Sequence, residues 1–436
     1  MNALINWMEH RFVPIAAKIG SQRHLVAIRD AFISIMPITM AGAVASLINV
    51  FARDLPGMFG MTDFVNLMSP VISVNGNVWW GTTVILSLVF IVALGYNLAN
   101  SYDVNPLAGG LIAISSYLVT TSQMTLDGSL WGYFHWGAFG ASALFTCLFV
   151  GLVSTSIYVW LTKKGFIIKM PDAVPPAVSK AFAAIVPGTI TIYVFAIIAF
   201  IFNTYVGQSL NDWVFSTIQT PFMIFTQGLP SVIIVTLTVQ LLWFFGLHGT
   251  NVLGPLLEGA WLTALTENNS AYMGGASISN LPYLWTRGSF DAYAWMGGAG
   301  CTLALVIALL VFSKREDEKA VAKVSAPMGI FNINEPVTFG LPIVLNPIYL
   351  IPWVLITPIL VTIAYLFTAV GLIPPVFIQV PWIVPPVFYA FLATGGNFLA
   401  AGVALLNFVI AVVLWSIFVK VANRMVDSKS SDESMK

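Results

Sequence analysis

Long apolar runs without a charged residue recur along the chain. A helix needs about 20 apolar residues to cross the hydrocarbon core of a bilayer. Runs of about that length lie near 31–51, 79–99, 137–161, 181–203, 292–313, 346–370 and 397–420, and shorter or interrupted runs lie near 106–121, 229–247 and 250–266. This pattern predicts an all-α integral membrane protein with ten transmembrane helices.

Two further apolar stretches, 326–345 and 375–396, fit neither a continuous helix nor a soluble loop. Their breaks are Pro327, Gly329, Pro336, Gly340 and Pro342 in the first, and Pro375, Pro381, Pro385, Pro386, Gly395 and Gly396 in the second. Irregular backbone at membrane depth is tolerated only where protein or water satisfies its polar groups. We therefore predict two re-entrant hairpins that face a cavity.

The same pattern divides the chain into segments. Residues 1–30 mix apolar and basic positions and predict an amphipathic cytoplasmic segment; they lack a signal-peptide core, so we expect them to be retained. The first five spans occupy 31–203, and an amphipathic linker occupies 204–228. The last five spans and both hairpins occupy 229–420, and 421–436 form a cytoplasmic tail.

Composition and charge support a membrane protein. Hydrophobic residues make up 58% of the 436 positions and charged residues only 8%. The net charge is zero and no basic block occurs, which argues against nucleic acid as a partner. Cys147 and Cys301 lie in apolar stretches without CxxC or Cys/His spacing, so we expect no disulfide, zinc site or redox pair.

The basic residues predict the orientation of the chain in the membrane, because short cytoplasmic loops are enriched in Lys and Arg. If the N-terminus is cytoplasmic and all ten runs cross, all of the 18 basic residues except Arg53 and Arg287 fall in cytoplasmic segments. This distribution predicts that both termini are cytoplasmic.

Glu335 is the most conspicuous candidate for function. It is the only charged residue between Lys323 and Lys420. A charged side chain at the centre of a membrane costs about 2.5 to 3.5 kcal/mol on insertion scales, so a lone acid there indicates a cavity or a ligand. The plainer alternative is a carboxyl neutralised by burial. Asn332 and Asn334 add amide groups beside it.

His248 is the second candidate, because it is the only histidine within a predicted span or hairpin. A lone histidine in an apolar segment is often structural. Here Gly246 and Gly249 flank it and the polar pair Thr250–Asn251 follows, which indicates a helix end that opens onto a cavity.

Acceptor, amide and aromatic groups together suit a sugar, whose hydroxyls need polar partners and whose C–H face needs a flat ring. Trp243 and Trp382 are the candidate rings. Arg287 and Asp291 form either a mutual ion pair or a ligand contact. Glu258 lies at an interface or in the cavity. The remaining aromatic candidates are assigned to membrane-interface belts: Trp79, Trp80, Trp131 and Trp136.

Several motifs together resemble a known family. They are 242–249 (LWFFGLHG), 297–303 (GGAGCTL), 331–340 (FNINEPVTFG), 380–382 (VPW), 393–396 (ATGG) and 168–176 (IKMPDAVPP). The combination resembles the sugar permease component, enzyme IIC, of phosphotransferase systems of the lactose/cellobiose/diacetylchitobiose type. The resemblance covers residues 10 to 425. It implies ten spans with two re-entrant hairpins in the bacterial cytoplasmic membrane, a homodimer formed by the first half, and a sugar site in the second half.

The resemblance also implies roles for individual residues. His248 and Glu335 match the family's pair that holds the hydroxyl to be phosphorylated, and Trp243 and Trp382 match its sugar-binding tryptophans. Phe139 stands where relatives often carry an amide. With these we group Asn332, Asn334, Asn251, Asp291 and Arg287 as candidate substrate-binding residues, and we expect no metal and no cofactor.

The implied activity is group translocation. A phosphocysteine on a separate cytoplasmic IIB protein donates its phosphoryl group to the sugar, and IIA, HPr and enzyme I supply IIB. A proton-coupled sugar symporter, with Glu335 as the proton carrier, is the main alternative. A membrane scaffold or receptor without sugar binding is the second.

Overall fold

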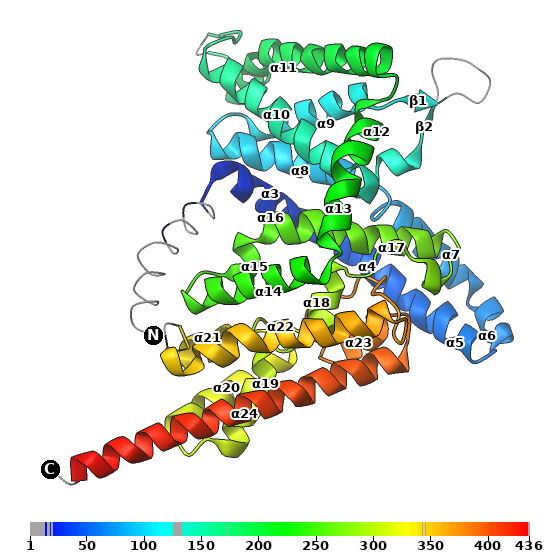
Figure 1. The fold of residues 1–436 in the computed structure, drawn as a ribbon. Helices are drawn as coiled ribbons and strands as arrows, with labels where there is room; N and C mark the ends of the chain where they lie inside the picture. The colour runs from blue at the N-terminus through cyan, green and yellow to red at the C-terminus, as the bar shows by residue number, and fades with distance from the viewer. Residues whose placement is uncertain are drawn as a thin grey trace.

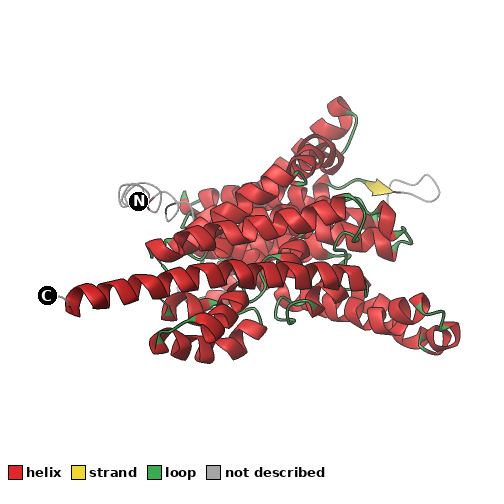
Figure 2. Ribbon diagram, turned by 60° about the horizontal axis from the view of Figure 1, so that its bottom comes forward, coloured by secondary structure: helices red, strands yellow, loops and turns green. Residues whose placement is uncertain are grey.

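A computed structural model describes residues 14, 18, 21–124, 133–171, 173–341, 343–344 and 346–434. Most of the described chain is helical, and one short antiparallel pair of strands, β1 (Gln123–Met124) and β2 (Tyr133–Phe134), is the only sheet in the described part (Figure 2). The all-α class is therefore confirmed. Most of the predicted amphipathic segment 1–30 lies outside the described residues, as does Trp131.

The first half begins with two helices in series and ends in a bundle. Its elements are α3 (Arg23–Ser34), α4 (Met36–Asn49), the π-helical η2 (Val50–Asp54), α5 (Leu55–Met58), α6 (Thr62–Leu67), α7 (Ser69–Trp80), α8 (Leu86–Ser101), α9 (Pro106–Thr120), the 3₁₀ turns η3 (Trp136–Ala138) and η4 (Ala141–Ala143), α10 (Leu144–Lys163) and α11 (Pro176–Ile201). Helices α8, α9, α10 and α11 pack together in the upper part of Figure 1. Helix α3 packs on α8 and continues as α4 past the second half.

Short helical pieces connect the halves. They are η5 (Phe202–Val206), α12 (Leu210–Val214), η6 (Phe215–Gln219) and α13 (Thr220–Thr226). The helical path bends by 76° before α14 (Leu229–Phe244). The bend falls at Gly228 and Pro230, because a proline within the first turn starts a new helix rather than continuing the old one.

The second half packs its helices around a core rich in tryptophan. Its elements are α14, α15 (Gly249–Val252), α16 (Gly254–Leu256), η7 (Leu257–Leu262), α17 (Thr263–Met273), η8 (Ile278–Asn280), α18 (Arg287–Tyr293), α19 (Thr302–Phe312), α20 (Glu316–Ile330), α21 (Glu335–Gly340), α22 (Pro347–Ala369), α23 (Phe388–Ala393) and α24 (Phe398–Ser434). Helix α22 packs on α14 and α24, and α24 also packs on α19.

Buried polar groups link these helices. Asn407 of α24 donates to the backbone oxygens of Tyr293 and Leu360, both at 2.9 Å, and Trp353 Nε1 of α22 donates to the Gln240 oxygen of α14 at 2.9 Å. A buried donor left without a partner costs about 1 to 3 kcal/mol, so these bonds favour one arrangement of the helices.

The structure breaks several of the predicted spans. Within the described residues, five helices are long and apolar enough to cross a membrane, or six if the bent pair is one span. The predicted span 292–313 is wrong as a continuous helix, because residues 294–301 form a loop in which Gly297, Gly298 and Gly300 have positive φ. The predicted run 250–266 is likewise divided into α15, α16, η7 and α17. Ten crossings therefore remain a prediction.

Irregular backbone occurs where the two hairpins are predicted. In the first stretch α20 ends at Ile330 and α21 begins at Glu335. In the second, a loop runs from Val370, after the end of α22, to Val387, before the start of α23. These breaks place both stretches beside the cavity described next.

Candidate functional site

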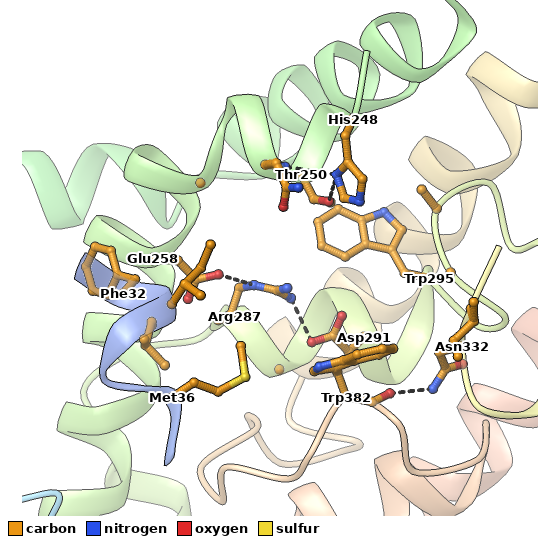
Figure 3. A pocket seen from close by; sticks show the side chains of 18 of the residues that line it. Phe32, Met36, His248, Thr250, Glu258, Arg287, Asp291, Trp295, Asn332 and Trp382 are labelled. Atoms are coloured by element: carbon orange, nitrogen blue, oxygen red, sulfur yellow. Dashed lines mark hydrogen bonds and ion pairs between the residues drawn. The ribbon is translucent and has the colours of Figure 1, made fainter. Parts of the chain in front are cut away.

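A cavity of about 680 Å³ lies between the first-half helices α3 and α4 and the second half of the chain. Its second-half lining comes from α14 to α18, from loop 294–301, from the segment before α21 and from loop 379–382. Its first-half wall includes Arg29, Phe32, Met36 and Met40. Figure 3 shows His248, Trp295 and Trp382 on one side of it and Phe32 and Met36 on the other. The candidate residues of the second half thus share one space, but the first half completes it.

His248 is held at a helix start. Helix α14 ends at Phe244, and Gly246, at φ 78°, turns the chain so that His248 becomes the residue that caps α15. Its Nδ1 accepts from the backbone N–H of Asn251 at 3.2 Å. An N–H donor at Nδ1 requires the lone pair there, so the ring proton of the neutral imidazole sits on Nε2.

Helix α15 packs tightly against α14. A Cβ on Gly249 would lie 2.2 Å from the Val239 oxygen, so no larger residue fits beside His248. The position of His248 therefore depends on this glycine as well as on its own hydrogen bonds.

Glu335 faces His248 across the cavity. It is the first residue of α21, and Pro336 follows it, where the missing N–H of a proline is tolerated. The Oε1 of Glu335 lies 3.7 Å from Nε2 of His248, and the two side chains are 45% and 39% exposed. This separation is too long for a direct hydrogen bond. A donor and an acceptor therefore face the cavity together, with room for a ligand hydroxyl that bonds to both.

The three tryptophans at the site play different parts. Trp243 is 2% exposed, and its ring centroid lies 4.3 Å from that of His248. It supports the imidazole from behind rather than offering an open face. Trp382 is 43% exposed and lines the cavity. Trp295 also lines it, although sequence reasoning missed it because it lies within a run interpreted as a span.

Three charged side chains that line the cavity form one cluster. Arg287 Nε lies 3.1 Å from Glu258 Oε1, and Arg287 Nη1 lies 2.7 Å from Asp291 Oδ2. The guanidinium carbon sits 5.1 Å from the ring centroid of Trp295, within cation–π range. Arg287 and Asp291 thus form the ion pair that was one of the two alternatives, and both also line the cavity. Glu258, whose place the sequence left open, lines the cavity beside them.

The three candidate asparagines line the cavity as well. Asn251 contributes its backbone N–H to His248. Asn334 is buried, and its amide has long contacts of 3.4 Å to the Ala299 oxygen and the Thr338 hydroxyl. The side chain of Asn332 bonds to backbone groups of two loops.

Other residues noted in the sequence lie elsewhere. Phe139 is not among the described residues that line the cavity. Trp79, Trp80 and Trp136 contact one another edge to face. Among the residues with described positions, no three His, Cys, Asp or Glu side chains are grouped so that they could hold a metal ion.

Comparison with known proteins identifies the family. The family model described as "Phosphotransferase system, EIIC" matches residues 29–358. The chain belongs to the EIIC family of the phosphotransferase system. The predicted resemblance is thereby confirmed, and this EIIC chain is a multi-pass membrane permease component.

Relatives of this EIIC chain match it along nearly its whole length. The cellobiose-specific EIIC component of Lactococcus lactis subsp. lactis is 39% identical over 98% of this chain and 100% of the relative. The oligo-beta-mannoside-specific EIIC component of Bacillus subtilis is 34% identical over 97% of this chain and 95% of the relative. The crystal structure of ChbC, the IIC component from the N,N'-diacetylchitobiose-specific phosphotransferase system, superposes with a TM-score of 0.89 at 31% identity, over 98% of this chain and 99% of that one.

Proposed function

We propose that this EIIC protein imports a β-linked disaccharide of the cellobiose, diacetylchitobiose or lactose kind and presents its C6 hydroxyl for phosphorylation. The observation that carries the proposal is the pair of groups 3.7 Å apart, Nε2 of His248 and Oε1 of Glu335. A hydroxyl between them accepts from the imidazole and donates to the carboxylate. The relatives' names support a β-linked disaccharide as its source.

The reaction moves one phosphoryl group. The S–P bond of a phosphocysteine on a cytoplasmic IIB protein breaks, and a bond forms between phosphorus and the sugar O6. The hydroxyl proton passes to the Glu335 carboxylate, which acts as the base, while His248 fixes the direction of the attacking oxygen. Phosphoryl transfer needs positioning and charge control more than covalent help from the protein, which fits a site built from these two groups.

The rest of the cavity supplies sugar contacts in this proposal. Trp382 offers its open face to the C–H surface of a ring, and Trp243 keeps His248 in place. Arg287 and Asp291 take hydroxyls of the second ring while they neutralise each other. Asn251 and Asn334 complete the polar lining, and Asn332, whose amide donates to two backbone oxygens, borders the same space.

We also propose how the protein assembles and how it is oriented in the membrane. Residues 31–203 form the homodimer and 229–420 carry the sugar, with 204–228 between them. Both termini face the cytoplasm, where IIB, itself supplied through IIA, HPr and enzyme I, reaches the site. The 436-residue chain lies in the bacterial cytoplasmic membrane.

Proteoliposomes that contain the purified protein test this function. With phosphorylated IIB inside, we expect external cellobiose to appear inside as the 6-phosphate; without phosphorylated IIB, no concentrative uptake is expected. Accumulation of free sugar driven by a pH difference alone would instead support the symporter and reject the phosphotransferase mechanism. Absence of saturable binding for all β-disaccharides tested would support the scaffold.

A further inference from the structure

Asn332 occupies a backbone position that usually belongs to glycine. It follows α20 with φ 63°, in the left-handed region. Its N–H donates to the Gly329 oxygen at 3.0 Å, and the next N–H, of Ile333, donates to the Met328 oxygen at 3.1 Å. These two bonds form the Schellman motif that ends many helices, where glycine prevails and asparagine is the tolerated alternative. The turn itself therefore does not require a side chain here.

The side chain of Asn332 nevertheless makes three hydrogen bonds to backbone groups. Its Nδ2 donates to the oxygens of Trp382 at 2.6 Å and Val384 at 2.8 Å. Its Oδ1 accepts from the Gly297 N–H at 2.7 Å. The partners fix the orientation of the amide, because a flipped group would place its nitrogen against an N–H and its oxygen against two carbonyls.

These bonds join three loops that carry the site. Loop 294–301 carries Trp295, and the segment after α20 leads into Glu335 at the start of α21. The turn closed by the Val384 N–H and the Pro381 oxygen at 3.0 Å carries Trp382. Figure 3 shows Asn332 bonded to the backbone of Trp382 at the edge of the cavity. The loops are also closely packed, since a Cβ on Gly298 would lie 2.9 Å from the backbone oxygen of Asn332.

We infer that Asn332 is a positioning residue that sets the Trp382 ring at a defined distance from the Glu335–His248 pair. Both amide protons of Asn332 are used by carbonyl groups of the protein, so the side chain has no donor left for a sugar hydroxyl. The inference rests on the proposed sugar-binding function of the cavity. It gives Asn332 a role through Trp382 rather than through direct contact with the sugar.

The helix end offers a matched pair of variants. Asn332→Gly keeps the left-handed turn and removes only the amide. Asn332→Asp keeps the shape and replaces the two donated bonds with repulsion between a carboxylate and two carbonyl oxygens. We expect Asn332→Gly to retain the melting temperature of the parent to within a few degrees and Asn332→Asp to lower it further. We expect both variants to bind cellobiose about tenfold more weakly by isothermal titration calorimetry.

A double-mutant cycle with Trp382→Ala separates positioning from direct contact. If Asn332 acts through Trp382, Asn332→Gly changes cellobiose affinity less than twofold once the ring is removed. If the loss from Asn332→Gly is as large without Trp382 as with it, Asn332 acts independently of the ring and the inference is overturned. Parent-like affinity in the Asn332→Gly single variant also overturns it.

The parent protein distinguishes this inference from the proposed function. If the parent binds neither cellobiose nor diacetylchitobiose nor lactose, the proposed function is wrong, whatever the double-mutant cycle shows. If the aspartate variant does not fold, the glycine variant alone decides, because its backbone conformation is the preferred one for that turn.

Discussion

Glu335→Gln tests the mechanism most directly, because it removes the charge of one group and little else. Glutamine has the same shape and retains an oxygen that accepts a hydrogen bond. The Glu335 side chain is 45% exposed to the cavity, so the change creates no void in the packed core. We therefore expect the variant to fold as the parent does.

The expected effects on binding and on phosphoryl transfer differ in size. Replacing a charge-assisted hydrogen bond with a neutral one costs about 1 kcal/mol, or about fivefold in sugar affinity. Loss of the general base lowers the rate of transfer by about 100-fold to 10,000-fold. The 3.7 Å gap to His248 supports this separation, since the imidazole still orients the hydroxyl while nothing accepts its proton.

The assay is transfer of radioactive phosphate from phosphorylated IIB to cellobiose, at saturating sugar, with binding measured separately by calorimetry. Asp317→Asn is the matched control. It also removes one carboxylate, but Asp317 is 66% exposed, pairs with Arg315 at 2.5 Å and does not line the cavity. We expect its transfer rate to equal that of the parent.

Equal transfer rates in Glu335→Gln and the parent would refute the role of this carboxylate as base. A loss of sugar affinity that alone accounts for the lower rate would reassign Glu335 to binding. Loss of pH-driven uptake of free sugar, with no change in transfer, would favour the symporter.

Three further variants probe other parts of the site. Trp382→Ala removes a ring that is 43% exposed, and we expect cellobiose affinity to fall about tenfold with the melting temperature unchanged; parent-like affinity would exclude stacking on this ring. Arg287→Met leaves the carboxylates of Glu258 and Asp291 without their cation in a mostly buried cluster, so we expect a loss of about 3 kcal/mol in stability, seen as a lower melting temperature. Adding Glu258→Gln removes one of the two charges and should partly restore the melting temperature. No restoration would contradict the idea that repulsion between the unpaired carboxylates destabilises the variant. Gly249→Ala places a Cβ 2.2 Å from a backbone oxygen of α14, so we expect it to displace His248 and slow phosphoryl transfer. Gly259→Ala is the control, because nothing lies within 4 Å of its added Cβ, and we expect it to transfer at the parent's rate. Equal transfer rates in the two variants would show that α14 and α15 separate at little cost.

The sequence predicts the chemistry of the site better than the course of its helices. Glu335 and His248 are conspicuous because a charge or an imidazole in an apolar run is expensive, and that cost does not depend on the details of the fold. The structure brings these two residues to 3.7 Å. The role of each candidate residue in sugar binding stays a prediction.

The break at 294–301 shows why helix boundaries are harder to predict. Hydropathy counts Ala, Trp, Met and Gly in that loop as apolar, so the run near 292–313 resembles an uninterrupted span. Three glycines with positive φ make it a loop instead. Trp295 was missed for the same reason, because its place in the cavity follows from the loop and not from its hydropathy. The wall from α3 and α4 was also missed, because most of its residues are apolar and its charged residue, Arg29, was assigned to the cytoplasmic N-terminal segment.

That wall is continuous in sequence, since its residues all lie within 29–40. The His248–Glu335 pair, by contrast, is assembled from segments far apart along the chain. If the cavity binds sugar as proposed, we expect changes confined to residues 29–40 to alter sugar preference without disturbing the His248–Glu335 pair. We expect chimaeras that exchange only these residues between relatives to change sugar affinity and to leave the transfer rate at saturating sugar unchanged.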